Sequence, residues 1–258
     1  MAKKIAMANQ KGGVGKTTSA INLSAALAEA GKRVLLVDAD PQGNATSGVG
    51  VEVKDGMTSL YDCLVGDVEF SQGITKTNYE NLDIIPSDME LSGAELELAG
   101  MMAREFRMKN GLEKLENEYD FILIDCPPSL GLITINALSA VDSVIIPIQC
   151  EYYALEGLSH LTETIRKIKK VLNPALSIEG VLLTMFDART NLSIQVVEEV
   201  KRFFPGQAYK TIIPRSVRLS EAPGFGQPIT VYDATSRGAE CYRELALEVI
   251  EMNGGEKT

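Results

Sequence analysis

The sequence predicts an α/β protein with one mainly parallel, twisted β-sheet that carries helices on both faces. Short apolar runs alternate with helical patterns along the 258 residues, and this alternation builds βαβ crossovers and a parallel sheet. A glycine-rich turn follows the first apolar run, and aspartates follow the second and the fourth runs. Because the strands of a parallel sheet end at one edge, we expect polar chemistry to gather there.

The predicted strands are short runs of β-branched and other apolar residues. They are residues 5–9, 34–37, 82–86, 121–124, 143–146, 180–183 and 210–213. The run at 34–37 is apolar without interruption, which is typical of a strand covered on both faces. The run at 121–124 has the same character and leads directly into an aspartate.

The predicted helices end at clear stop signals. They cover residues 16–30, 154–172, 191–204 and 234–252, and the acidic stretch from 92 to 118 is expected to be rich in helix. Gly31 ends the first helix, Pro174 follows the second and Gly206 follows the third.

One domain is predicted for residues 1–253, with a short frayed tail at residues 254–258. The chain has no internal repeat, low-complexity stretch or linker that would divide it. Its composition, 45% hydrophobic and 23% charged, is that of a globular protein. No apolar run approaches the ~18 residues of a membrane span, and no signal-peptide core follows Met1. We therefore expect a cytoplasmic protein.

The cysteines and the single histidine give little indication of a metal site. Cys63, Cys126, Cys150 and Cys241 are widely spaced and form no CxxC pair, so free buried thiols are expected. A cluster or zinc site shared across a dimer is the alternative. His160 falls on a predicted helix, where a packing or surface role is expected.

The net charge of −10 argues against binding nucleic acid through the charge of the whole protein. The distribution is uneven, however. Residues 166–218 contain ten Lys or Arg and four Asp or Glu, a local net charge of +6. An acidic protein with one basic face is therefore predicted.

The glycine-rich turn has the sequence and context of a phosphate-binding loop. Glycines let the backbone approach phosphate oxygens, a lysine carries positive charge to the β- and γ-phosphates, and a hydroxyl ligates Mg²⁺. Lys16 is the expected phosphate lysine and Thr17 the expected direct Mg²⁺ ligand. The residues expected to bind ATP here are Lys11, Gly12, Gly13, Val14, Gly15, Lys16, Thr17 and Thr18. The fold class is thus a single-domain P-loop NTPase.

The loop departs from the general pattern GxxxxGK[ST] in two places. Gln10 replaces the first glycine, and Lys11 adds a second lysine. Lys11 would lie beside the triphosphate but point away from its own γ-phosphate cradle. It is either a solvated loop lysine or a charge supplied to a nucleotide on a facing subunit, as an arginine finger is. The second interpretation predicts ATP held between two protomers of a homodimer.

Two acidic clusters complete the predicted site. Asp38 and Asp40 follow the second strand, and Asp125 follows the fourth in a Walker B pattern. Asp125 is expected to hold Mg²⁺ through water, and Asp40 to orient or deprotonate the attacking water, with a possible water-mediated metal contact. Asp38 is the weaker candidate. The alternative for each is a helix N-cap or turn aspartate.

With these motifs in place, the chain resembles the ParA/Soj family of chromosome- and plasmid-partitioning ATPases. The matching segments are NQKGGVGKTT at 9–18, LLVDADPQGNATSG at 35–48, FILIDCPPSLGLITINAL at 121–138, PIQCEYYALEG at 147–157, LLTMFDARTNLS at 182–193 and YKTIIPRSVRLSEAP at 209–223. Only the acidic stretch from 51 to 117 matches loosely.

The resemblance implies further roles for individual residues. Lys11 would cross to the partner's ATP, Gly12 would pack at the dimer interface, and Asp40 would be needed for hydrolysis. Residues that would lie near the nucleotide base are Pro214 and Ser216. Residues that would bind double-stranded DNA without sequence preference are Arg189 and Arg218; otherwise they are ordinary surface arginines.

The resulting prediction is an ATPase switch. ATP closes a homodimer, the dimer binds non-specific DNA and associates with the nucleoid, and a ParB-like centromere-binding partner stimulates an otherwise slow hydrolysis. The main alternative is a MinD-like division regulator that binds membrane, but the acidic C-terminal helix disfavours contact with anionic lipid. An iron–sulfur carrier would need paired cysteines, and a small-molecule ligase or kinase would need a further substrate motif.

Overall fold

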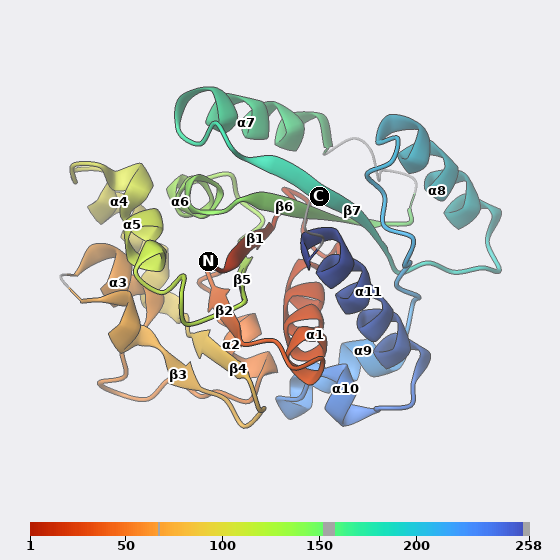
Figure 1. Cartoon of the computed structure of the whole chain (residues 1–258), viewed down its shortest axis with the longest axis horizontal. Helices are drawn as coiled ribbons and strands as arrows, with labels where there is room; N and C mark the ends of the chain where they lie inside the picture. Colours follow the sequence, from red (N-terminus) through yellow and green to blue (C-terminus); the bar gives the residue numbers. More distant parts are fainter. Residues whose placement is uncertain (67, 152–157, 255–258) are drawn as a thin grey trace.

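The computed structural model describes residues 1–66, 68–151 and 158–254, which form a seven-stranded sheet with helices on both faces (Figure 1). The strands are β1 (Lys3–Met7), β2 (Val34–Asp38), β3 (Thr75–Lys76), β4 (Leu82–Ile85), β5 (Phe121–Asp125), β6 (Ser143–Gln149) and β7 (Ser177–Thr184). Their order is β3-β4-β2-β5-β1-β6-β7. Every neighbouring pair is parallel except β3 with β4. The predicted fold class is confirmed.

The helices connect and cover these strands. The α-helices are α1 (Lys16–Glu29), α2 (Asn44–Gly48), α3 (Leu60–Val65), α4 (Ala94–Leu98), α5 (Arg107–Glu113), α6 (Leu132–Ala140), α7 (Leu158–Val171), α8 (Asn191–Phe203), α9 (Val217–Glu221), α10 (Ile229–Tyr232) and α11 (Arg237–Gly254). Short 3₁₀ helices are η1 (Phe70–Gly73), η2 (Met89–Gly93), η3 (Arg104–Phe106) and η4 (Ala222–Phe225).

The sheet separates two hydrophobic cores because successive strand residues face opposite sides. In β2, Leu35 and Val37 belong to the core beneath α3, α5, α6 and α7, whereas Val34 and Leu36 belong to the core beneath α1 and α11. Figure 1 shows α1 and α11 side by side on their face of the sheet, with α6 and α7 on the opposite side. Both faces are covered, which explains the uninterrupted apolar runs.

The prediction of a strand at residues 210–213 is wrong. Its segment follows the edge of β7 but makes only isolated bridges, at Ala208 and Pro214. The reason is that the N–H groups of Lys210 and Thr211 donate to the Glu248 carboxylate on α11, at 2.8 and 3.2 Å, and not to β7. The seventh strand of the sheet is instead the two-residue β3.

Other boundaries follow the sequence with smaller differences. The acidic stretch at 92–118 is divided into α4, η3 and α5, with Ala103 in the left-handed region (φ 52) between the first two. The helix predicted at 154–172 is α7, and its first expected residues, 154–157, lie outside the described part of the chain. The last helix extends to Gly254, and the tail at 255–258 likewise lies outside the described residues.

Candidate functional site

The loop between β1 and α1 forms a backbone cradle suited to phosphate. Gly13 and Gly15 have φ values of 73 and 86, which other residues rarely adopt. Gly15 is also the N-cap of α1, and no side chain caps this helix end. The first N–H groups of α1 are therefore left for another acceptor, and the helix dipole favours an anion there. The cradle fits the phosphates of ATP.

Lys16 is the buried cation of this loop. Its side chain is only 6% exposed, and its ammonium donates to the carbonyl of Lys11 at 3.2 Å. Burial lowers the pKa of Lys16, and the nearby Asp125, Cys126 and Asp40 oppose that shift. The ammonium is thus held beside acidic groups and bonded to a neutral carbonyl, an acceptor weaker than phosphate.

Asp125 is the buried anion that faces this lysine. It ends β5 in register with Met7 of β1 and Asp38 of β2, directly beside the loop. Burial and the charge of Asp38 raise the pKa of Asp125 well above its usual value, while Thr17 and Lys16 lower it. Among the described residues, no group makes a close hydrogen bond to the buried carboxylate oxygens, and the Thr17 hydroxyl is the donor that stabilises their charge. Such a buried carboxylate fits a site for Mg²⁺ or its water ligands.

The same residues show that the protein supplies few metal ligands by itself. The described part of the chain contains no group of three or more His, Cys, Asp or Glu able to hold a metal ion. Mg²⁺ usually binds through one or two protein groups, phosphates and water. The chemistry Mg²⁺ supplies when bound is neutralisation of phosphate charge.

Asp38 and Asp40 have different surroundings although they are two residues apart. Asp38 accepts hydrogen bonds from the Thr46 N–H (2.8 Å), the Thr46 hydroxyl (2.7 Å) and the Asp40 N–H (3.2 Å). Burial raises the pKa of Asp38 to about 6, and the Thr46 bonds oppose that shift. Asp38 therefore anchors the loop. Asp40 is 9% exposed, and its Oδ1 accepts the Gln42 N–H at 3.0 Å.

A small pocket adjoins the loop on the side of α9. It has a volume of about 100 Å³, and its lining includes Gly15, Thr18, Met185, Pro214 and Ser216. Met185 holds a left-handed conformation (φ 51) where β7 ends, a strained geometry for a residue with a side chain. The structure thus brings both residues expected near the base to the phosphate loop.

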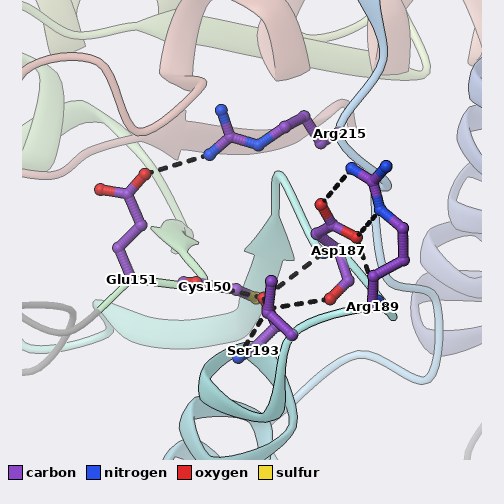
Figure 2. A network of polar contacts seen from close by, with 7 residues as sticks. Cys150, Glu151, Asp187, Arg189, Ser193 and Arg215 are labelled. Carbon is purple, nitrogen blue, oxygen red and sulfur yellow. Dashed lines mark hydrogen bonds and ion pairs between the residues drawn. The ribbon is translucent and has the colours of Figure 1, made fainter.

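The candidate DNA-binding arginines are exposed but already paired within the protomer. The Arg189 side chain is 87% exposed and donates to both Asp187 oxygens, at 2.9 and 2.6 Å. This contact holds the pKa of Asp187 well below its usual range. Figure 2 shows Asp187 facing Arg189, while Arg215 reaches across to Glu151 at 3.0 Å.

Arg218 on α9 has a similar situation. Its guanidinium lies 3.2 Å from Glu221 and 3.5 Å from Asp233, and its centre is 6.0 Å from the Tyr232 ring centroid. Both arginines thus make the intramolecular ion pairs expected of ordinary surface arginines. These contacts are solvent-exposed and weak enough for phosphate to compete with them.

Known proteins match the chain over nearly its whole length. A protein-family model described as an AAA domain matches residues 2–178. The sporulation initiation inhibitor protein Soj of Bacillus subtilis (strain 168) is 62% identical over 96% of this chain and 98% of that protein. The chromosome partitioning protein ParA of Myxococcus xanthus is 54% identical over 96% of this chain and 88% of that protein. The chain belongs to the ParA/Soj family of partitioning ATPases.

Solved structures extend the comparison beyond close ParA/Soj relatives. A Mycobacterium smegmatis protein titled cobyrinic acid a,c-diamide synthase, bound to an ATP analogue and magnesium, is 37% identical with a TM-score of 0.87. The alignment covers 100% of this chain and 98% of that one. The septum site-determining protein MinD of Pyrococcus horikoshii, complexed with Mg-ADP, is 30% identical with a TM-score of 0.82, over 98% of both chains.

The remaining features of this ParA/Soj chain agree with the sequence. All four cysteines are free and buried. Burial raises the pKa of the Cys63 thiol to about 12 and of the Cys150 thiol to about 11. Within the described ranges, no helix has the length and apolar character needed to cross a membrane.

Sequence reasoning missed the residues that brace the loops of the site. Thr46 links Asp38 to the Ser87 N–H, which donates to the threonine hydroxyl at 3.0 Å. Thr184, at the end of β7, donates to the Val14 carbonyl at 2.9 Å. Both residues lie in segments that resemble the ParA/Soj family, Thr46 in 35–48 and Thr184 in 182–193, but nothing in those segments singles them out. Thr184 has one further signal, its position at the end of β7 where ligands gather, whereas Thr46 lies in the short helix α2.

Proposed function

We propose that this ParA/Soj chain is a Mg·ATP-driven DNA-partitioning switch. ATP binds the loop of residues 11–18, two protomers close around the nucleotides, and the dimer binds non-specific double-stranded DNA. Hydrolysis is slow until a ParB-like centromere-binding protein stimulates it, and release follows. The ATP-bound dimer is then associated with the nucleoid.

The main support for this proposal is that a buried lysine and several aspartates lie together at the carboxyl edge of the sheet. Lys16 holds the β- and γ-phosphates, and Thr17 provides the hydroxyl for Mg²⁺. Asp125, buried beside Lys16, contributes its carboxylate to the water ligands of the metal. Asp40, with 9% of its surface exposed beside the loop, orients the attacking water. Pro214 and Ser216 border the pocket that takes the base.

The dimer interface is supported by the two residues at the loop's start. A Cβ built on Gly12 meets no atom within 4 Å in the protomer, so nothing inside the chain requires glycine there. We attribute the glycine at position 12 to close contact with the facing subunit, where a side chain would obstruct closure. Lys11 has its carbonyl engaged by Lys16 and is partly exposed, which leaves its ammonium for the partner's triphosphate.

DNA binding is supported by the charge distribution. Arg189 and Arg218 are exposed, and the described part of α7 ends with basic residues, as α8 does. A dimer presents each arginine twice, and contacts to phosphates add without any sequence preference. A membrane-binding role like that of a MinD relative is less well supported, because α11 has no basic residue in its last turn.

Binding of random-sequence DNA by the Asp40→Ala protein tests the proposal. This variant should bind ATP without hydrolysing it, form a dimer on gel filtration and bind DNA only with ATP, more weakly as salt rises. The matched control is Lys11→Ala with ATP, which should remain monomeric. An Asp40→Ala protein that stays monomeric, or binds DNA equally without ATP, contradicts the proposal.

The arginine assignment has its own test. Changing Arg189 and Arg218 to glutamate in the Asp40→Ala background should abolish DNA binding and leave the ATP-dependent dimer intact. Loss of the dimer would mean that these residues stabilise the interface and do not contact DNA.

A further inference from the structure

Asn9 is a buried polar residue directly between β1 and the phosphate loop. Its side chain is one of the few buried amides of the chain, with a total exposure of 4%. The amide nitrogen donates to the Pro147 carbonyl of β6 at 2.7 Å, and the amide oxygen accepts the Lys11 N–H at 3.0 Å. Asn9 thus connects the start of the loop to a neighbouring strand.

The anchor for this connection is rigid. β6 pairs with β1 in parallel, and the Ala8 N–H donates to the Ile145 carbonyl at 3.2 Å, just before Asn9. Pro147 lies within the same strand. Because the Asn9 side chain is hydrogen-bonded to that strand, it fixes the backbone of Lys11 relative to the sheet.

The peptide groups on both sides of the Lys11 Cα are therefore fixed. Asn9 holds the N–H, and Lys16 holds the carbonyl at 3.2 Å. When ATP draws the Lys16 ammonium to its phosphates, the carbonyl contact is given up and the Asn9 contact remains. Of these two contacts, only the hydrogen bond from the Lys11 N–H to Asn9 then remains. This bond sets the direction in which the Lys11 side chain leaves the backbone.

We infer that Asn9 is a positioning residue that aims Lys11 at the nucleotide of the facing subunit. This inference rests on the proposed function, in which Lys11 acts across the dimer. Among the described residues, the Asn9 side chain hydrogen-bonds to Pro147 and Lys11 and not to Gly13, Gly15 or Lys16, the groups that cradle the protomer's own phosphates. Its loss should damage the partner's site and spare its own.

Two substitutions separate the contacts of Asn9. Asn9→Ala removes both hydrogen bonds, and the loss of one well-made buried bond should lower ATPase activity and ATP-dependent dimerisation about tenfold. Asn9→Ser retains an oxygen that can accept the N–H two residues ahead, so it should recover the dimer. ADP affinity, which needs only the protomer's own cradle, should match the wild type in both variants. Equal losses of ADP affinity and dimerisation would overturn the inference.

Mixing variants gives the decisive measurement. In a heterodimer of Asn9→Ala with Asp40→Ala, one site combines the first protomer's Asp40 with a correctly aimed Lys11 from the second. The ATPase activity of the mixture should therefore exceed the sum of the two proteins alone. If Asn9 only supports its own loop, that site stays defective and the activity equals the sum, which overturns the inference.

A second mixture distinguishes this failure from failure of the proposed function. Lys11→Ala with Asp40→Ala should also recover activity, because the second protomer supplies Lys11 to the first. If this control recovers and the Asn9 mixture does not, the role of Asn9 is wrong and the cross-dimer lysine stands. If the control does not recover, Lys11 does not act across a dimer and both proposals fail. Urea unfolding of each variant identifies a folding defect, and Asn9→Leu, which is close in size to asparagine and also lacks both hydrogen bonds, then replaces Asn9→Ala in the mixture.

Discussion

Replacing Asp187 by asparagine tests whether the candidate DNA-binding arginine is masked in the free protomer. Asp187 accepts side-chain hydrogen bonds from Arg189 at 2.9 and 2.6 Å, and a backbone bond from the Arg189 N–H at 3.0 Å. Asparagine keeps an oxygen for the backbone N–H, so the turn survives, but it lacks the charge that holds the guanidinium. The substitution therefore separates the ion pair from the shape of the loop.

The expected effect is tighter DNA binding with a steeper dependence on salt. When Arg189 of the wild type moves to a DNA phosphate, Asp187 loses its partner and takes up a cation from solution. This uptake offsets the release of one counterion from the DNA. The variant loses this cancellation at both copies in a dimer. The slope of log affinity against log salt should then steepen by about 1.8. Between about 50 and 200 mM salt, this amounts to roughly an additional twelvefold fall in affinity.

Fluorescence anisotropy of labelled random DNA, titrated with Asp40→Ala protein and ATP at several salt concentrations, measures this slope. The control is Glu198→Gln, which removes the same charge from an exposed position on α8. Its slope should stay near that of the parent protein. An unchanged slope for Asp187→Asn, or an equal change in the control, would refute the masking of Arg189 by Asp187.

Three further predictions follow from the packing, two of them with a matched comparison variant. Gly12→Val should keep ATP binding and abolish the ATP-dependent dimer on gel filtration, since a Cβ there meets nothing in the protomer; a persistent dimer contradicts this. Gly43→Ala and Gly31→Ala should each lose roughly 1–2 kcal/mol in urea unfolding from a left-handed backbone. Gly43→Ala should lose more, because its Cβ meets a carbonyl oxygen at 2.9 Å. Tyr242→Phe breaks a buried hydrogen bond of 3.1 Å and should cost roughly 1–2 kcal/mol. Tyr209→Phe, whose hydroxyl has no hydrogen-bond partner in the described ranges, should cost nothing, so equal losses would count against both assignments.

Most of the sheet could be predicted from the sequence because its strands are buried on both faces. β2 and β5 are uninterrupted apolar runs that end in aspartates, and both features come from position in a parallel sheet. The edge segment at 210–213 has two polar residues followed by two isoleucines, and Glu248 accepts the N–H groups of Lys210 and Thr211. That carboxylate lies on α11, 37 or more residues away in sequence, so no local pattern reveals it.

The candidate site divides in the same way. The residues expected to contact the nucleotide or Mg²⁺, such as Lys16 and Asp125, lie in motifs that can be recognised because their members bind the same ligand. The residues that brace them act through hydrogen bonds between segments distant in sequence, from Ser87 to Thr46 and from Thr184 to Val14. Thr184 donates to a carbonyl 170 residues away, which only the sheet order brings near. Sequence patterns therefore indicate what touches the ligand and leave out what holds those groups in place.

The two cations central to the proposed switch are both engaged inside the protomer, but by acceptors of different strength. Lys16 is bonded to the neutral carbonyl of Lys11, whereas Arg189 is bonded to the carboxylate of Asp187. A triphosphate is a much better acceptor than a carbonyl, so ATP displaces the first contact readily. A DNA phosphate carries about the same charge as Asp187, so one protomer gains little by exchanging the second. A dimer repeats the exchange on one DNA molecule, and the effective concentration of the second site makes the small gains add. In the proposed switch, binding of DNA would then be tied to dimerisation, and through dimerisation to ATP, without any change in the shape of the DNA-binding surface.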